Sequence, residues 1–323
     1  MTILSQEKNE ISLHVLFQRK VPRISVRYKI FRFILKRSGI KKILALPTKE
    51  LLQKAQKING KRCFKIPKDE RHSYEDIVFL NQFHCLKIES TEGKAQKAVL
   101  FFYGGGMILG PDRSDIKFAT KIGEQSKSDI WFPFYPLCIE NSIDFLYRMV
   151  FEVYKKMVQK YGAENISFLG FSSGAALCIG LCQYNHQQSK PLPVPKLVIA
   201  CSPGSVPQSA EEKAKMQNLA NKDIMVNPAF MSRMQDIMCH EKAIPAYMLS
   251  GVSGDFTDMP QIHFYYGTDE VLYAEAEYFK NACEKYNVPY HMHIGTGMCH
   301  CYPLIPFCPE SKKACAEIIE FLK

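Results

Sequence analysis

The sequence predicts an α/β protein whose core is a mostly parallel, doubly wound sheet flanked by helices. Short apolar runs, typical of buried strands, alternate with helical patterns from about residue 74 to the C-terminus. One of these runs leads directly into a Gly-x-Ser-x-Gly turn and then into a helix-compatible run. The 323 residues are 46% hydrophobic and 23% charged, an ordinary composition for one large domain with an appendage, or for two domains at most.

The expected elements follow one another in a regular order. Two short runs, 74–80 and 83–88, are separated by Asn81-Gln82 and predict an opening hairpin. Later apolar runs predict strands over 98–103, 129–135, 166–169, 196–201, 261–266 and 290–294. Helical patterns predict helices over 114–125, 142–161, 272–286 and 310–322, besides the one that follows the Gly-x-Ser-x-Gly turn.

The N-terminal part differs in character from the rest. We expect residues 1–62 to form a helical cap segment and residues 63–323 the catalytic domain, with a helical, polar and Met-rich insertion at about 205–245. Four residues fall on one helical face: Ile24, Tyr28, Phe31 and Leu35. A second apolar side holds Val26, Ile30, Phe33 and Ile34. A helix that is apolar on two sides is more typical of packing between protein layers than of lying on a membrane.

The same region is strongly basic. Residues 19–42 carry ten Lys and Arg and no acid, which equals the net charge of +10 of the whole chain. The favoured interpretation is a cap whose charged face is solvated; attraction to anionic lipid, to nucleic acid or to an acidic substrate is the alternative. No nucleic-acid-binding module is recognisable, so we expect no nucleic-acid partner, and membrane contact is the less favoured interpretation.

Cysteine usage indicates the compartment. The twelve cysteines, from Cys63 to Cys315, form no C-x-x-C pair and lie mostly in apolar segments, where a reduced cysteine behaves as a small hydrophobe. Cys178 and Cys182 share a helix face, but no histidines follow at zinc-finger spacing, so no metal site is expected. No apolar run reaches about 18 residues and no secretory signal is recognisable. The sequence predicts a cytoplasmic protein.

The segment Gly170–Gly174 carries the expected nucleophile. It reads Gly-Phe-Ser-Ser-Gly between a strand and a helix, which is the context of a nucleophile elbow at Ser172. Small residues are needed there because the chain turns sharply and the helix packs closely on the strand. A simple Gly/Ser turn is the alternative interpretation.

A serine nucleophile needs a general base and a carboxylate to orient it. In α/β-hydrolases the chain order is Ser, acid, His. Asp269 and Glu270 follow the strand 262–266, and His300 lies in the loop after the last strand, so they are the candidates for acid and base. Three further histidines lie inside strands, where they are expected to be structural or exposed: His263, His291 and His293.

The segment Gly104–Gly106 directly follows a strand. Glycines let backbone N–H groups approach a ligand closely, as a hole for a tetrahedral oxyanion requires. The N–H of Ser173, after the nucleophile, is expected to add another donor. Phosphate binding is the alternative, but the loop lacks a G-K-[ST] ending and is not G-x-G-x-x-G.

Together these motifs resemble the hormone-sensitive-lipase-like family of α/β-hydrolase esterases and lipases, in the right order over residues 95–323. The resemblance implies the α/β-hydrolase fold with a helical cap, Ser172 and His300 as catalytic residues, Gly104, Gly105 and Ser173 as oxyanion donors, and no cofactor. Aligning Leu272 with the leucine of the family's D-P-L-x-D motif puts the acid at Glu270, with Asp269 as the alternative.

Three residues depart from the family pattern. Tyr103 replaces the histidine of H-G-G-G, and Phe171 and Ser173 replace the usual Asp and Ala beside the nucleophile. We expect Tyr103, Gly106 and Phe171 to contact the substrate, with Phe171 forming an apolar wall of the site. None of these changes removes a member of the triad.

The sequence thus predicts a serine carboxylesterase for short-to-medium acyl esters, whose partner is a small-molecule ester. The cap segments are expected to shape its acyl and alcohol pockets. Family members often form dimers, which leaves a homodimer open. An amidase or deacetylase with the same triad, a membrane-associated lipase, and a catalytically silent binding protein of the same fold are the alternatives.

Overall fold

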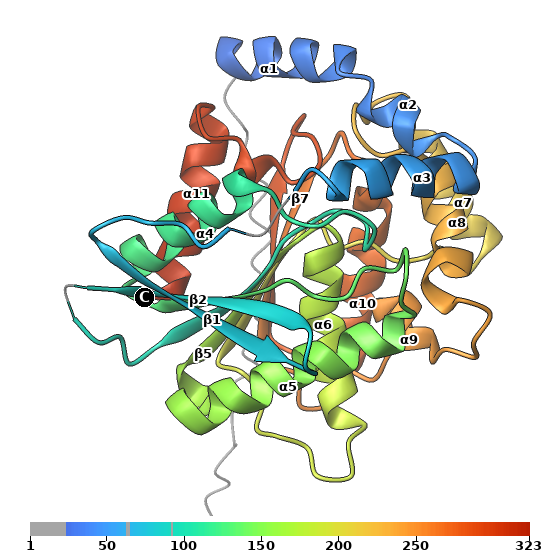
Figure 1. The fold of residues 1–323 in the computed structure, drawn as a ribbon. Coiled ribbons are helices and arrows are strands. Elements are labelled where there is room, and N and C mark those ends of the chain that lie inside the picture. The colour runs from blue at the N-terminus through green and yellow to red at the C-terminus, as the bar shows by residue number, and fades with distance from the viewer. Residues whose placement is uncertain (1–23, 63–64, 92) are drawn as a thin grey trace, which may run out of the picture.

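A sheet of eight strands forms the centre of the computed structural model, which describes residues 24–62, 65–91 and 93–323 (Figure 1). The strands lie in the order β1-β2-β4-β3-β5-β6-β7-β8. Their bounds are β1 His72–Phe79, β2 Phe83–Ser90, β3 Ala98–Phe102, β4 Asp129–Pro133, β5 Ile166–Phe171, β6 Leu197–Cys201, β7 Gln261–Gly267 and β8 Tyr290–Gly295. Every strand predicted from the sequence is present, with ends that differ by a few residues.

The sheet is mostly parallel, as predicted. β1 and β2 form the expected antiparallel hairpin and β2 pairs antiparallel with β4, whereas β3 to β8 pair in parallel. β3, β4, β5 and β6 are buried along their whole length, as expected for parallel strands covered on both faces. The chain leaves β3 toward β4 and then returns to its other side as β5, so a crevice opens at the carboxyl ends of these strands.

Helices cover both faces of the sheet (Figure 1). α4 and α11 pack together on one face, and α5, α6 and α10 lie on the other. Their bounds are α4 Arg113–Ser126, α5 Ile143–Tyr161, α6 Ser173–His186, α10 Ala276–Lys285 and α11 Pro309–Leu322. The predicted helices are confirmed, although the segment 272–286 begins as a 3₁₀ turn, η3 (Val271–Glu275), before α10.

The N-terminal helices cross one end of the molecule, and those of a later segment begin beside them and continue down its side (Figure 1). The N-terminal ones are α1 Val26–Arg37, α2 Ile40–Leu44 and α3 Thr48–Asn59, and the later ones are α7 Ala210–Leu219, α8 Pro228–Cys239 and α9 Ala246–Leu249. Hydrogen bonds join the two segments. Lys41 Nζ donates to the Asp223 carbonyl at 2.7 Å, and Arg233 Nη2 donates to the Leu44 carbonyl at 2.8 Å. We call these two segments together the cap.

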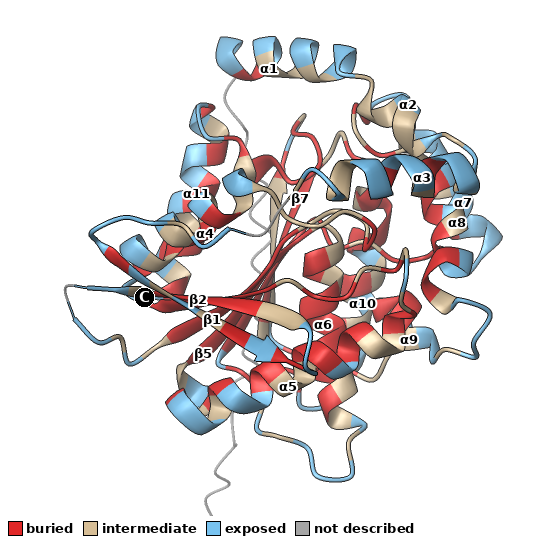
Figure 2. Cartoon of the chain, in the orientation of Figure 1, coloured by how far each residue is buried: buried red, intermediate tan, exposed pale blue. Residues whose placement is uncertain are grey.

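One expectation about α1 is wrong. Tyr28 is fully buried and its neighbours Phe31 and Leu35 pack against the core, but the second apolar side of the helix is not covered by any of the described residues. Its four residues are among the exposed large apolar side chains: Val26 (70%), Ile30 (54%), Phe33 (58%) and Ile34 (62%). The reason is position, since α1 crosses the top of the molecule and its outward side is exposed (Figure 2). Arg19, Lys20 and Arg23 of the basic stretch lie outside the described residues.

Eleven of the twelve cysteines are free thiols, all buried except the half-buried Cys239, while Cys63 lies outside the described residues. Burial raises the pKa of Cys178 and of Cys182, so these thiols are poor nucleophiles and poor metal ligands. Within the part of the chain that the structure describes, no helix is long and apolar enough to cross a membrane.

Candidate active site

Ser172 occupies a sharp turn between β5 and α6. Its φ of 55° and ψ of −123° are a strained conformation for a residue with a side chain. The glycines on either side explain how the turn fits. A Cβ on Gly170 would lie 2.2 Å from the Gly174 carbonyl oxygen, and one on Gly174 would lie 2.4 Å from the Tyr103 carbonyl oxygen. Only hydrogen side chains fit at both positions, so this segment has the geometry of a nucleophile elbow.

The structure brings Ser172, His300 and Glu270 together. His300 Nε2 lies 2.8 Å from Ser172 Oγ, and His300 Nδ1 lies 2.6 Å from Glu270 Oε2. The three residues follow β5, β8 and β7, whose carboxyl ends meet at one edge of the parallel sheet. These two short contacts connect a hydroxyl to a carboxylate through an imidazole, which is the arrangement of an activated serine.

Glu270 is held by more than the histidine. Its Oε1 accepts hydrogen bonds from the Gly267 N–H at 2.8 Å and from Ser202 Oγ at 2.9 Å, and Ser202 Oγ in turn accepts from the Cys301 N–H at 3.0 Å. Sequence reasoning did not select Ser202. The available signal was its position directly after β6, the strand between those that carry the nucleophile and the acid.

Asp269, the alternative acid, faces the cap. Its carboxylate pairs with Arg32 of α1 at 2.6 Å, both side chains being partly buried. The same loop is tied to the cap two residues later, because Asp223 Oδ2, between α7 and α8, accepts from the Val271 N–H at 2.7 Å. Of the two neighbouring carboxylates, Glu270 is therefore the one at His300.

The pair Glu270–His300 is coupled. Burial raises the pKa of the Glu270 carboxyl, while the hydrogen bond to His300 opposes that effect. Burial lowers the pKa of His300, but the neighbouring Cys301 thiol and the Glu270 carboxylate raise it further than burial lowers it, so that it lies well above its ordinary value. The buried pair therefore stabilises the cationic, doubly protonated form of the imidazole, which forms when the base takes the proton of a serine.

The glycine loop lies against the nucleophile. A Cβ on Gly104 would be 3.1 Å from Ser172 Cβ, so the backbone itself approaches the serine. Gly105 has φ of 141° and a Cβ there would lie 2.5 Å from the Leu109 carbonyl oxygen, which excludes any side chain. Ser173 is the first residue of α6, where backbone N–H groups have no helical acceptor. These are the donors expected at an oxyanion site.

A tyrosine pair supports this loop where the family pattern has a histidine. The rings of Tyr103 and Tyr135 stack with centroids 4.3 Å apart, and the Tyr135 hydroxyl donates to the Tyr103 carbonyl at 2.9 Å. Asn59, at the end of α3, fixes the far side of the loop: its amide donates to the Ile108 carbonyl at 2.9 Å and accepts from the Gly110 N–H at 3.0 Å. The cap thus helps to hold the loop.

One of the residues predicted to contact substrate lies in the core. Phe171 is 1% exposed and packs against Phe101 and Phe118, with ring centroids 5.8 and 5.6 Å away, so it belongs to the core beneath the elbow and forms no wall of an open site. Its side chain points inward because it alternates with its neighbours along β5. Gly106 contacts the cap, since a Cβ there would lie 2.6 Å from the ring of Phe230 in α8.

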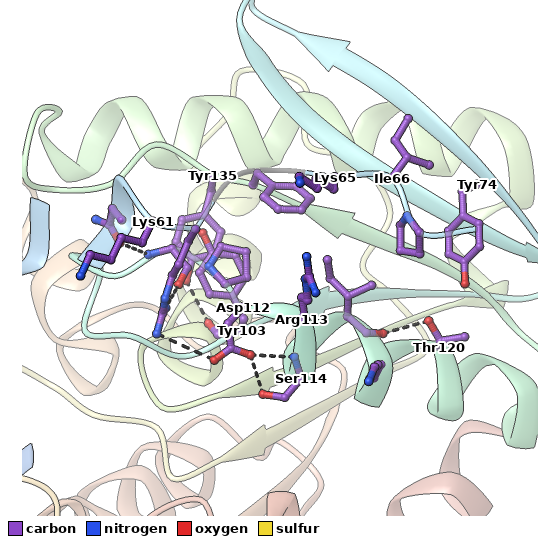
Figure 3. Close-up of a pocket in the computed structure, with 18 of the residues that line it drawn as sticks. Lys61, Lys65, Ile66, Tyr74, Tyr103, Asp112, Arg113, Ser114, Thr120 and Tyr135 are labelled. Carbon is purple, nitrogen blue, oxygen red and sulfur yellow. Dashed lines mark hydrogen bonds and ion pairs between the residues drawn. The ribbon is translucent and has the colours of Figure 1, made fainter. Parts of the chain in front are cut away.

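A cavity of about 1640 Å³ lies beside Tyr103, the third of these residues (Figure 3). Lys61 lies at one end of it and Tyr74 at the other, with Tyr103, Tyr135 and Arg113 between them. None of the described residues that line it belongs to the triad. The cavity therefore lies behind the glycine loop and is distinct from the surface on which Ser172 reacts.

The strand histidines are not part of the site. His263 is buried. Its Nδ1 lies 3.0 Å from Nε2 of His293, and its Nε2 lies 3.1 Å from the amide nitrogen of Gln261. Burial and the two neighbouring imidazoles lower the pKa of His263 to about 3, so this ring stays neutral. In the described ranges no three His, Cys, Asp or Glu side chains are arranged to hold a metal ion.

Comparison with known proteins supports the fold. The family model of the alpha/beta hydrolase fold matches residues 99–304, well over half of the chain. A curated protein named acetyl-hydrolase, from Streptomyces hygroscopicus, is 24% identical over 242 residues, which cover 70% of this chain and 75% of that protein.

Solved structures superpose on nearly the whole chain. An esterase/lipase from an uncultured bacterium gives a TM-score of 0.76 at 19% identity, covering 92% of this chain and 98% of its own. A hormone-sensitive lipase from a metagenome library gives a TM-score of 0.76 at 21% identity, covering 91% of this chain and 97% of its own. A putative esterase from Staphylococcus aureus gives a TM-score of 0.72 at 18% identity, covering 84% of this chain and 90% of its own. At these identities the likeness shows a shared fold, which confirms the fold predicted from the sequence.

Proposed function

The chain belongs to the family with the alpha/beta hydrolase fold, and from that premise we propose that it is a serine carboxylesterase that hydrolyses short-to-medium acyl esters. One observation carries the proposal: the continuous contact from Ser172 Oγ through His300 to Glu270, next to a glycine loop whose central residue, Gly105, has no room for a side chain. The names of its relatives, esterases, lipases and an acetyl-hydrolase, support this reaction class.

In the proposed acylation step, Ser172 Oγ attacks the carbonyl carbon of the ester while His300 Nε2 takes the serine proton. Glu270 accepts from His300 Nδ1 and so selects the tautomer with a free Nε2. The carbonyl oxygen becomes an oxyanion, which the N–H groups of Gly104, Gly105 and Ser173 stabilise. The tetrahedral intermediate then collapses, the alcohol leaves with the proton from His300, and an acyl-enzyme remains.

Water completes the cycle. His300 takes a proton from a water molecule, whose oxygen attacks the acyl carbon, and a second tetrahedral intermediate releases the acid and Ser172. We assign the selection of the acyl and alcohol groups to the cap. The cap contacts the catalytic loops at two points. Phe230 lies against Gly106 of the glycine loop and Arg32 pairs with Asp269 beside Glu270, so residues of the cap border the reacting centre. The cytoplasmic location stays a prediction from the cysteines.

The test is turnover of p-nitrophenyl esters from acetate to dodecanoate by the wild type, Ser172→Ala and Ser173→Ala. We expect a maximum at short or medium chains and a loss of about 10³-fold or more in Ser172→Ala. Ser173→Ala is the matched control, because it removes only a hydroxyl that the proposed mechanism does not use and keeps the backbone N–H. It should retain activity within about threefold.

Other outcomes would redirect the assignment. Turnover that survives Ser172→Ala would show that another residue is the nucleophile. Faster cleavage of p-nitroacetanilide than of the matched acetate ester would replace the esterase by an amidase. Absence of turnover in every variant, with the fold intact by circular dichroism, would favour a silent binding protein.

A further inference from the structure

The inner side of α1 is fastened to the loops that carry the triad. Ser25, which caps the helix, donates from its backbone N–H and from Oγ to the Glu310 carboxylate at 2.6 and 2.9 Å. Ile24 packs so closely on Gly297, in the His300 loop, that a Cβ there would lie 2.5 Å from its side chain. Arg32 pairs with Asp269 beside the catalytic glutamate. The helix therefore lies in a fixed orientation over the catalytic end of the molecule (Figure 1).

The outer side of α1 is an exposed apolar face. Its members are spaced i, i+4, i+7 and i+8, which places them on one stripe of the helix: Val26, Ile30, Phe33 and Ile34. Half or more of each side chain is exposed. They make up half of the eight large apolar side chains that are exposed among the described residues, and all four lie on a single helix.

Cations border this face on both sides. At 100° per residue, Lys29 and Lys36 lie along one margin of the apolar stripe and Arg27 along the other. Arg37 lies within the stripe, its guanidinium 3.5 Å from the ring centroid of Phe33. In the described part of the chain none of these four cations forms an ion pair, whereas Arg32, on the inner side, does. Their charge is thus available to a partner.

We propose that α1 docks this protein on an anionic lipid bilayer, with its apolar stripe inserted among the acyl chains and its bordering cations on the lipid phosphates. An exposed stripe flanked by Lys and Arg is the pattern of a helix that lies in the interface plane. Each cation near an anionic surface adds to the attraction, and the apolar side chains supply the part that salt does not screen.

A second copy of the chain fits this face less well than a bilayer does. A two-fold dimer would place each apolar stripe on its equivalent and so bring the unpaired cations of both copies together. An anionic bilayer neutralises the same cations. If the proposed function holds, docking also turns the triad end toward the membrane, since Arg32 of α1 pairs with Asp269 beside Glu270.

The experiment is flotation of the full-length chain with vesicles of phosphatidylcholine alone or with 30% phosphatidylserine, in 50 and 500 mM KCl. We expect binding to the anionic vesicles at 50 mM KCl, at least tenfold weaker binding to the neutral ones, and a severalfold loss at 500 mM KCl. Equal binding to both vesicle types, or none to either, would overturn the proposal.

Two double variants test the two halves of the face. Phe33→Ser/Ile34→Ser removes apolar contact and Lys29→Glu/Lys36→Glu reverses the charge of one margin, and each should weaken binding to anionic vesicles by about tenfold or more. Two controls lie away from α1. Val78→Ser changes an exposed apolar residue of β1, Lys190→Glu/Lys285→Glu makes the same change of net charge, and neither should alter binding more than twofold.

Circular dichroism and turnover of p-nitrophenyl acetate establish that the variants are folded. Sedimentation of the chain without lipid measures its oligomeric state and so tests whether a second copy covers the apolar face of α1. A wild-type dimer that Phe33→Ser/Ile34→Ser converts to a monomer, together with no vesicle binding, would assign the face to a second copy and overturn the proposal. Binding reduced as much by the controls as by the α1 variants would do so as well.

Discussion

Two glutamates five residues apart, Glu270 and Glu275, are both fully buried, yet their surroundings differ. Glu270 accepts hydrogen bonds from a backbone N–H, a hydroxyl and an imidazole. Neither carboxyl oxygen of Glu275 has a hydrogen-bond partner of good geometry among the described residues, and the neighbouring Ser205 hydroxyl opposes the rise in its pKa less than burial and Glu212 promote it. Burial raises the pKa of both. At Glu270 the neighbouring imidazole offsets part of this rise, whereas at Glu275 nearby Glu212 adds to it and the pKa reaches about 8.

The difference teaches what makes a buried carboxyl useful. A carboxylate with three donors can stay charged without water and so hold an imidazole in one orientation. A carboxyl with none stays neutral by keeping its proton, and it costs stability wherever the pH would ionise it in the unfolded chain. Glu270 contributes to the proposed chemistry, and Glu275 reduces the stability of the fold at alkaline pH.

Glu270→Gln should give the largest effect. All three neighbours of the Glu270 carboxylate are donors, and an amide has only one oxygen, so an NH₂ group must face either His300 or the pair of Gly267 and Ser202. Either orientation disturbs the tautomer or the position of the imidazole. We expect kcat for p-nitrophenyl acetate to fall by about 10²–10⁴-fold with little change in KM.

Asp269→Asn is the matched control for that variant, since it makes the same change on the neighbouring residue, which pairs with Arg32. It should lower kcat by less than about threefold. The pH profile adds a second readout. The acid limb of kcat/KM should lie above 6.5 in the wild type, because the pKa of His300 is raised, and should move to lower pH in Glu270→Gln. A larger loss in Asp269→Asn would assign the acid to Asp269.

Glu275→Gln should make the protein more stable at alkaline pH. Because the pKa of this group is about 8 in the folded protein and near 4.5 in the unfolded chain, the unfolded state loses its proton first as the pH rises. Wild-type stability therefore falls between pH 4.5 and 8, by about 1.4 kcal/mol for each pH unit. The variant lacks this slope, and its free energy of unfolding should exceed the wild-type value by about 4 kcal/mol at pH 8.

Urea denaturation at pH 5, 6.5 and 8 measures this effect. At pH 5 the two proteins should agree within about 1 kcal/mol, since pH 5 lies only about half a unit above the unfolded pKa and most of the pH-dependent loss occurs at higher pH. Glu277→Gln, an exposed residue that pairs with Lys215, is the control and should follow the wild type at every pH. A constant difference between Glu275→Gln and wild type across the three pH values would contradict the assignment of a raised pKa.

Much of this site was predictable because it obeys local rules. Strand ends are visible as apolar runs, and in a parallel sheet their carboxyl ends meet at one edge, so residues after β5, β7 and β8 had to be neighbours. The required chain order then left few candidates. The elbow was visible in Gly170 and Gly174, because both lie where a Cβ would strike the backbone.

The remainder depends on contacts between distant segments, which no local pattern contains. The bond of Asp269 to Arg32 spans 237 positions, and it needs the placement of α1, which only the folded cap provides. Sequence periodicity showed two apolar sides on α1 but could not tell which of them faces solvent. Phe171 was assigned to the site because it adjoins the nucleophile in sequence, although neighbouring strand residues point to opposite faces.

Ser202→Ala should have the smallest effect of the series and separates the bonds that support Glu270. It removes the hydroxyl donor at 2.9 Å and leaves the Cys301 N–H without its acceptor, while Gly267 and His300 still hold the carboxylate. We expect kcat to fall by about tenfold with KM unchanged, in line with a hydrogen bond to a charged group of about 1.5 kcal/mol.

Ser202 acts through Glu270, so a positioning role also predicts that the acid limb of the pH profile moves to lower pH, because the less stabilised carboxylate supports the imidazolium less. Ser205→Ala, which removes a buried hydroxyl beside Glu275, is the control and should change neither kcat nor the acid limb of the pH profile. A fall in kcat at an unshifted limb would mean that Ser202 stabilises the loop and leaves the charge of Glu270 unaffected.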